Sequence, residues 1–191
     1  RGLLISMRPR QWVKNLLVVA VPLASGRMLE PAVMANTALA FVSFCAAASS
    51  VYLTNDLLDR ERDAHHPEKR KRPIAAGHVS VPLAMSAAMV LAVMALAVPA
   101  LLGNRDLSLL LLAYLVLQAL YVLWAKHQPV LDLASVAAGF VLRAVAGGVA
   151  SGIPISTWFL TVTAASAMFV VAGKRYSELV THGHDGGTRP G

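Results

Sequence analysis

The chain has 191 residues, of which 57% are hydrophobic and only 14% charged, whereas about a quarter of the residues of an ordinary soluble domain are charged. With a mean hydropathy of +0.61 and a pI of about 10.1, this composition excludes an ordinary soluble domain and indicates an integral membrane protein. Its basic excess is explained more simply by cytoplasmic loops than by a nucleic-acid-binding surface, and its single cysteine, Cys45, excludes a disulfide framework.

Six stretches without acidic or basic residues follow one another along the chain, at 15–26, 31–55, 79–104, 107–125, 133–151 (interrupted by Arg143) and 153–173. Five of them reach the roughly 20 residues that a helix needs to cross a membrane. The first is shorter and reaches that length only if it includes Lys14. Continuous apolar runs without two-residue alternation predict helices rather than a barrel. We therefore predict an all-α integral membrane protein, a bundle of six transmembrane helices; a cleaved signal peptide is an alternative interpretation of residues 1–25.

The basic residues outside Arg143 are distributed unequally if the six spans alternate in direction. Fourteen of them fall on the side of the amino terminus, the 59–78 loop, the 125–130 loop and the tail, whereas two, Arg27 and Arg105, fall on the other side. By the positive-inside rule the richly basic side is cytoplasmic. We therefore expect a multi-pass plasma-membrane protein whose active site faces the cytoplasm.

The fifth predicted span carries small residues at four-residue spacing, including Ala144, Gly148 and Gly152. Such spacing allows a helix to approach its neighbours closely. The same span contains Arg143, about 10 residues or 15 Å from its cytoplasmic end. An unpaired guanidinium is expensive at that depth. Arg143 is therefore expected either to bind a substrate anion directly or to pair structurally with a backbone carbonyl or Asp132.

The stretch NDLLDRERDAHHPEKRKRP, residues 55–73, concentrates five acidic and six basic residues at the end of the second span. On a helix, Asp56, Asp59 and Asp63 lie within an arc of about 60°. Clustered carboxylates repel one another unless a cation is present, and their hard oxygen atoms suit Mg²⁺ that carries a diphosphate. The basic residues that follow would share the charge of such a polyanion. A solvated helix end neutralised by nearby arginines is the alternative interpretation.

Two further basic segments lie on the same predicted side of the membrane. RPRQWVKN, residues 8–15, precedes the first span, and GKRYSEL, residues 173–179, ends the sixth. Lys14, Lys174 and Arg175 are candidates to position phosphate groups, although Arg8 and Arg10 can also be explained as topology signals. Glu178 would complete a metal shell or pair with Lys174.

The charged stretch also carries a resemblance to a known family. NDLLDRERD resembles the NDxxDxxxD motif of the UbiA-type intramembrane prenyltransferase superfamily, and HPEKRKRPIAAGHVS resembles its HPxKxxRPxxxG continuation. RPRQWVKNLL, SSVYLTND, GFVLRAVAGG and GKRYSEL further resemble the decaprenyl-phosphate phosphoribosyltransferase branch, which serves cell-wall arabinan synthesis. The resemblance implies a fold of about nine transmembrane helices, so that residues 1–191 would form a single domain with six of them and lack its C-terminal end. The aspartate-rich motif that aromatic prenyltransferases carry after the sixth helix reads KRYSELVTHGHD here, which favours the phosphoribosyl branch.

The function that this resemblance implies is Mg²⁺-dependent transfer of 5-phosphoribosyl from phosphoribosyl diphosphate to a polyprenyl (decaprenyl) phosphate. It assigns Asp56, Asp59 and Asp63 as catalytic residues and metal ligands. The expected substrate-binding residues are Lys14, Asn15, Asn55, Arg62, Lys69, Arg70, Arg72, Arg143, Lys174, Arg175, Tyr176 and Glu178. Alternatives are polyprenyl transfer to an aromatic acceptor and, from another class, a transporter or lipid-binding protein with a cation site. The expected partners are the two substrates and the membrane, without nucleic acid; a monomer and a homo-oligomer are both compatible with the sequence.

Overall fold

The protein is a bundle of helices. The computed structural model describes residues 1–124 and 128–183, and every regular element in these two ranges is helical, which confirms the predicted fold class. The elements are α1 (Gly2–Ser6), the 3₁₀-helix η1 (Pro9–Val19), α2 (Ala20–Ala24), α3 (Pro31–Leu58), α4 (Arg60–His65), the 3₁₀-helix η2 (Lys69–Lys71), α5 (Val81–Leu101), α6 (Arg105–Leu123), α7 (Pro129–Ala150) and α8 (Thr157–Gly183).

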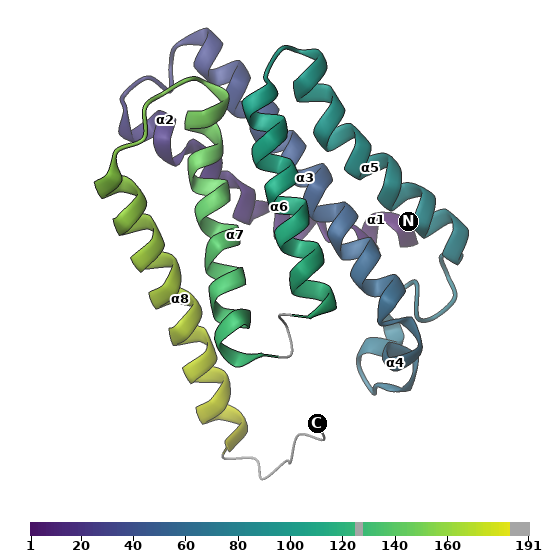
Figure 1. Ribbon diagram of the computed structural model, residues 1–191. Helices are drawn as coiled ribbons and strands as arrows, with labels where there is room; N and C mark the ends of the chain where they lie inside the picture. The colour runs from purple at the N-terminus through teal and green to yellow at the C-terminus, as the bar shows by residue number, and fades with distance from the viewer. Residues whose placement is uncertain (125–127, 184–191) are drawn as a thin grey trace.

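Five of these helices, α3, α5, α6, α7 and α8, are long and apolar enough to cross a membrane. They run alternately up and down, so that the end of α3, the start of α5, the end of α6 and the end of α8 lie at one end of the bundle (Figure 1). Half of the apolar window is buried in α3 and in α7, but only 17% in α5 and 11% in α8. Helices α3 and α7 therefore form the centre of the bundle. The apolar side chains on the outer helices, such as α5 and α8, are free to contact lipid.

The first predicted span differs from the others because it is not one continuous α-helix. It falls in the 11 residues of η1, the 5 residues of α2 and the turn that follows. A 3₁₀-helix rises about 2.0 Å per residue against 1.5 Å for an α-helix, so η1 is longer than an α-helix of the same number of residues. The segment is nevertheless not among the helices that are long and apolar enough to cross a membrane.

The first segment packs against α7 through two adjacent glycines. A Cβ atom placed on Gly147 would lie 1.9 Å from the carbonyl oxygen of Val18, and one placed on Gly148 would lie 2.5 Å from Cγ1 of Val21. Any side chain at Gly147 would therefore collide with the backbone of η1. The close approach predicted from the small residues of this span is present, and its partner is the first segment of the chain.

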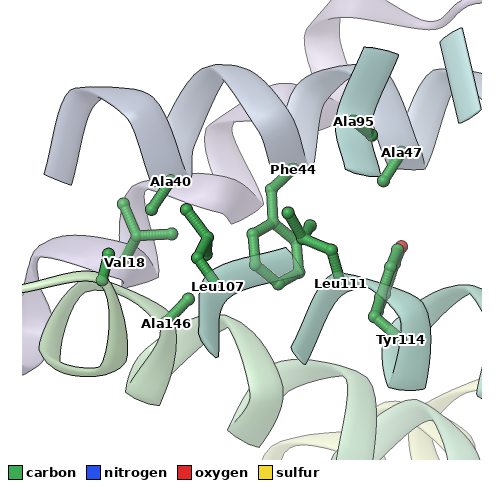
Figure 2. Close-up of a cluster of buried hydrophobic side chains, with 10 residues drawn as sticks. Val18, Ala40, Phe44, Ala47, Ala95, Leu107, Leu111, Tyr114 and Ala146 are labelled. Atoms are coloured by element: carbon green, nitrogen blue, oxygen red, sulfur yellow. The ribbon is translucent and has the colours of Figure 1, made fainter. Parts of the chain in front are cut away.

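The largest buried cluster joins η1 to the central helices (Figure 2). Phe44 of α3 and Tyr114 of α6 lie with ring centroids 5.1 Å apart at an interplanar angle of 58°, a tilted arrangement that aromatic pairs favour. Val18 of η1 and Ala146 of α7 fill the other end of the cluster. This cluster thus fixes η1 beside the middle of α3. A second cluster, in which Leu3 and Met7 pack near Leu53, holds the first residues of the chain beside the end of α3, where the acidic motif begins.

Candidate functional site

The acidic motif lies where α3 gives way to α4. Helix α3 ends at Leu58, and Asp59, with φ −90° and ψ 3°, separates the two helices. Backbone hydrogen bonds nevertheless continue the helical pattern through this break, from Asp59 N to Asn55 O at 2.9 Å and from Asp63 N to Asp59 O at 2.8 Å. The three aspartates therefore keep a nearly helical spacing, which is close to the common face predicted from the sequence. The α-helix itself is interrupted at Asp59, the middle one of the three.

Two of the three aspartates converge on one arginine. The Nη1 atom of Arg72 donates to Oδ1 of Asp56 at 3.2 Å and to Oδ2 of Asp63 at 2.6 Å. Both carboxylates are almost completely buried, with 3% and 2% exposure. Asp59 does not share this contact and instead accepts a hydrogen bond from Nη2 of Arg62 at 2.9 Å. No group of three or more His, Cys, Asp or Glu side chains suited to a metal ion is assembled within the described residues.

A second arginine, Arg8, completes the ion-pair group. Its Nη2 atom donates to Oδ1 of Asp56 at 2.6 Å, and its guanidinium lies over the ring of Tyr52, 4.9 Å from the centroid. Buried carboxylates are stable only with such compensation. The four charged groups Arg8, Asp56, Arg72 and Asp63, which we call the arginine–aspartate group, therefore carry no formal net charge.

The backbone of Arg8 is held in an unusual conformation. Its φ of 53° and ψ of 60° lie in the left-handed region, which is uncommon for a residue other than glycine and often marks a functional constraint. On either side of it, Trp12 Nε1 donates to Ser49 Oγ at 3.0 Å, and Ser49 Oγ donates to the Met7 carbonyl at 3.3 Å. These two bonds fasten the chain around Arg8 to α3.

The substrate-binding residues expected from the sequence do not include Arg8, because a basic residue at that position is also explained as a topology signal. The sequence feature that could have indicated the unusual backbone of Arg8 is the proline that follows it, because Pro9 disfavours a helical conformation for the residue before it. Its contact with Asp56 joins residues 48 positions apart, which no local pattern predicts.

A cavity of about 400 Å³ opens beside the arginine–aspartate group. Its polar lining comes mainly from Arg8, Asp56, Lys69, Lys71 and Arg72, and its remaining walls come from α1 and the rest of the 68–73 segment. Within that segment, the backbone N–H groups of Glu68 and Lys69 donate to Nδ1 of His66 at 3.2 and 3.4 Å. The cavity is therefore rich in groups that bind a polyanion.

Arg143 lies in the interior of the bundle, 8% exposed. Its guanidinium donates to Asn15 Oδ1 at 2.8 Å, to the Gly139 carbonyl at 2.7 Å and to the Tyr114 hydroxyl at 2.7 Å. The pairing with a backbone carbonyl that the sequence left open is thus present. Asn15, fully buried, also donates to Sγ of Cys45 at 3.3 Å. Arg143 connects η1, α6 and α7 through acceptors that are all electrically neutral.

The comparison with known proteins identifies the family. A family model described as "UbiA prenyltransferase family" matches residues 16–181. The chain belongs to this family. The UbiA assignment agrees with the resemblance of the NDLLDRERD stretch, and it confirms the sequence-based identification.

Relatives of this UbiA-family chain carry a more specific name. It is 50% identical over 93% of its length to the decaprenyl-phosphate phosphoribosyltransferase of Mycolicibacterium smegmatis and 45% identical over 97% of its length to that of Corynebacterium glutamicum. The chain spans 57% of the length of each of these relatives. A solved UbiA homolog from Archaeoglobus fulgidus, bound to DMAPP and Mg²⁺, has a TM-score of 0.76 at 24% identity, with 88% of this chain and 60% of that chain covered. The last likeness shows the shared UbiA fold.

The predicted basic residues Arg175, Lys14 and Lys174 of this UbiA-family chain lie toward α7 and η1, and one of them contacts Asp132, which the sequence had suggested as a partner of Arg143. Asp132, near the start of α7, accepts hydrogen bonds from Arg175 of α8 and from the Tyr121 hydroxyl, the latter at 3.0 Å. Asp132 therefore pairs with α8 rather than with Arg143. Lys14 interacts electrostatically with Lys174, Arg143 and Arg8, so basic groups of η1, α7 and α8 lie near one another.

The other predicted residues are placed as follows. Asn55 is half-buried, Lys69 and Arg70 are exposed on the 66–72 segment, and Tyr176 of α8 is 72% exposed. The side chain of Glu178 lies outside the described residues, and so does Asp185.

Proposed function

We propose that the protein to which this chain belongs transfers the 5-phosphoribosyl group from phosphoribosyl diphosphate to a polyprenyl phosphate, such as decaprenyl phosphate. The observation that carries this proposal is the 45–50% identity to proteins named decaprenyl-phosphate phosphoribosyltransferase, over at least 93% of the chain. We further propose that the enzyme lies in the plasma membrane, that its site opens to the cytoplasm, and that its product serves cell-wall arabinan synthesis.

A divalent cation fits the residues at this site. Asp56 and Asp63 each direct a carboxylate oxygen to the same nitrogen of Arg72, so the space between them already accommodates positive charge. Hard carboxylate oxygens are the ligands that Mg²⁺ prefers. Bound by Asp56, Asp63 and Asp59, Mg²⁺ would neutralise charge on the departing diphosphate. The UbiA homolog of known structure is bound to Mg²⁺, which supports a divalent cation in this fold.

The side chains of the protein would bind and orient the donor. Arg8, Lys69, Lys71 and Arg72 line the 400 Å³ cavity, and guanidinium groups bind phosphate oxygens through paired hydrogen bonds. The bond between ribose C1 and a diphosphate oxygen breaks, the diphosphate leaves with the bonding electrons, and an oxygen of the lipid phosphate forms the new bond to C1. The acceptor is already anionic, so the reaction needs no strong general base.

The acceptor phosphate would lie near the second basic region. Lys14 and Lys174 come from η1 and α8, and the buried guanidinium of Arg143 adds a positive potential that neutral acceptors do not cancel. The isoprenoid tail would contact the exposed apolar side chains of the outer helices, such as Met89 and Val93 of α5.

The test uses membranes that contain the full-length protein. Phosphoribosyl diphosphate labelled in the ribose, supplied with decaprenyl phosphate and Mg²⁺, should place label in the lipid-phosphate fraction, and a labelled polyprenyl diphosphate supplied with an aromatic acceptor should not label that acceptor. Asp56→Asn should abolish transfer. Asp106→Asn is the matched control and should retain transfer, because Asp106 is exposed in the first turn of α6, away from the acidic motif. Label in the aromatic product instead would favour prenyl transfer, and cation uptake without either product would favour a transporter.

A further inference from the structure

Arg143 is a buried cation whose hydrogen bonds all go to neutral groups. Its guanidinium donates to the Asn15 amide, the Gly139 carbonyl and the Tyr114 hydroxyl. It also lies over the rings of Phe44 and Tyr114, 5.8 and 4.8 Å from their centroids. Among the residues that the structure describes, no carboxylate forms an ion pair with it. These contacts hold the guanidinium but leave its full positive charge in the interior of the bundle.

The side chain of Asn15 stands where a counter-charge would fit. A buried charge without a counter-charge lowers the stability of a protein. Aspartate has nearly the shape of asparagine, and Oδ1 of Asn15 lies 2.8 Å from Nε of Arg143, so a carboxylate there would form a buried ion pair. The amide nitrogen of Asn15 donates to Sγ of Cys45 at 3.3 Å, and a thiol sulfur is a weak acceptor. The neutral side chain therefore gains little for its own stability, but it keeps the charge of Arg143 available to a ligand.

The charge of Arg143 is directed toward the end of the bundle that carries the other basic groups. The Gly139 carbonyl that it contacts lies one turn nearer the start of α7, at the end of the bundle where α8 also terminates (Figure 1). Lys14 interacts electrostatically with both Arg143 and Lys174, and both lysines are exposed. A buried charge is screened less than an exposed one, so an anion bound beside the two lysines is also attracted by Arg143.

We propose that Asn15 is a positioning residue that orients Arg143 without neutralising it, so that the guanidinium serves as a counter-charge for a phosphate monoester bound beside Lys14 and Lys174. The inference rests on the proposed function, because the lipid phosphate of the acceptor and the 5-phosphate of the donor both have this chemistry. Asn15 is fully buried, so it acts through Arg143 and does not touch the ligand.

The first experiment separates charge from shape with Asn15→Asp. Microscale thermophoresis measures the affinity of the full-length protein in detergent micelles for farnesyl phosphate and farnesol, which represent the lipid, and for ribose 5-phosphate, which represents the donor. The new carboxylate neutralises Arg143, so a phosphate that depends on this charge should bind at least about 5-fold more weakly, whereas farnesol should bind as before. The same variant should unfold at an equal or higher denaturant concentration, because the buried cation gains a counter-charge.

The probes also identify the source of the phosphate. Whichever of farnesyl phosphate and ribose 5-phosphate binds more weakly to Asn15→Asp is the group that Arg143 attracts, and either result supports the counter-charge. Unchanged affinity for both phosphates would overturn the proposal. Arg27→Gln, which lowers the net charge by the same one unit at an exposed ion pair with Glu30, is the matched control and should change neither affinity.

The second experiment tests the proposal if Asn15→Asp does not fold. Arg143→Lys keeps a positive charge and Arg143→Met removes it, whereas both lose the planar fork of the guanidinium. Arg143→Met should therefore bind the affected phosphate at least about 5-fold more weakly than Arg143→Lys does. An arginine with a merely structural role would leave the two variants equal in affinity, and that result would refute the counter-charge.

The two proposals fail separately. Phosphoribosyl transfer by a protein whose affinity for both phosphates does not depend on Asn15 or on the charge of Arg143 would overturn the counter-charge and leave the proposed function intact. Charge-dependent binding of a phosphate by a protein that does not transfer phosphoribosyl groups would support the counter-charge and overturn the proposed function.

Discussion

Replacing Gly147 by alanine tests whether the contact between η1 and α7 holds the first segment in place. The added Cβ would lie 1.9 Å from the Val18 carbonyl oxygen and 3.0 Å from Cγ of Pro22, whereas an ordinary contact is about 3.4 Å or more, so η1 must retreat by roughly 1.5 Å. Asn15 lies on the same short helix and would lose its 2.8 Å bond from Arg143. Overpacking and a lost bond to a buried charge together predict a decrease of about 3 kcal/mol or more in the free energy of unfolding.

Two measurements follow this change in the full-length protein in detergent micelles. Denaturant unfolding reports the loss of stability, and the rate at which a maleimide labels Cys45, located by peptide mass mapping, reports the local displacement. The Cys45 thiol is 7% exposed and accepts a hydrogen bond from Asn15, so a retreat of η1 should raise its labelling rate at least about tenfold, since the protecting contact would lose about 1.4 kcal/mol or more.

The matched control makes the same chemical change where space is available. A Cβ on Gly173 of α8 would meet no atom within 4 Å, so Gly173→Ala should leave Cys45 protected and stabilise the helix by about 0.5–1 kcal/mol. If Gly147→Ala were as stable as the parent protein and labelled no faster, the close packing of η1 on α7 would be refuted.

Three further predictions concern the polar contacts and the metal. Arg143→Met should lower the free energy of unfolding by about 2–4 kcal/mol, because it leaves the buried polar atoms of Asn15 and Tyr114 without their partner; denaturant unfolding measures the loss, and an unchanged midpoint would contradict it. Asp132→Asn should weaken the ion pair with Arg175 by about 1–3 kcal/mol and increase proteolysis of α8, which a protection assay would detect. Removal of divalent cations with EDTA should reduce phosphoribosyl transfer to background, and Mg²⁺ should restore it without refolding; transfer that persists in EDTA would exclude the metal.

The sequence predicts much of the fold because membrane spans depend on local composition. Runs such as 31–55 and 79–104 are long and apolar, and α3 and α5 coincide closely with them. The acidic motif and the basic loop that follows it were also evident, because their charges are adjacent in the chain. The small residues of 137–152 correctly indicated close packing, although they did not identify the partner.

Other features depend on contacts between distant residues, which no local pattern contains. The ion pair between Arg8 and Asp56 joins positions 48 apart, and the bond between Arg143 and Asn15 joins positions 128 apart. The sequence predicted a common face for three aspartates, but the break in the helix at Asp59 lets that residue pair with Arg62 instead. Nor does composition predict the 3₁₀ winding of η1.

The winding of η1 also imposes a three-residue repeat on the start of the chain. Side chains at every third position of a 3₁₀-helix lie in one row, and Trp12, Asn15 and Val18 occupy such a row: the first bonds Ser49, and the other two are fully buried. Lys14 falls in the next row, a third of a turn away, and is exposed. A single residue inserted between Trp12 and Asn15 would move Trp12 out of the row that Asn15 and Val18 occupy, so the chemistry of the exposed rows can change but the spacing of this segment cannot.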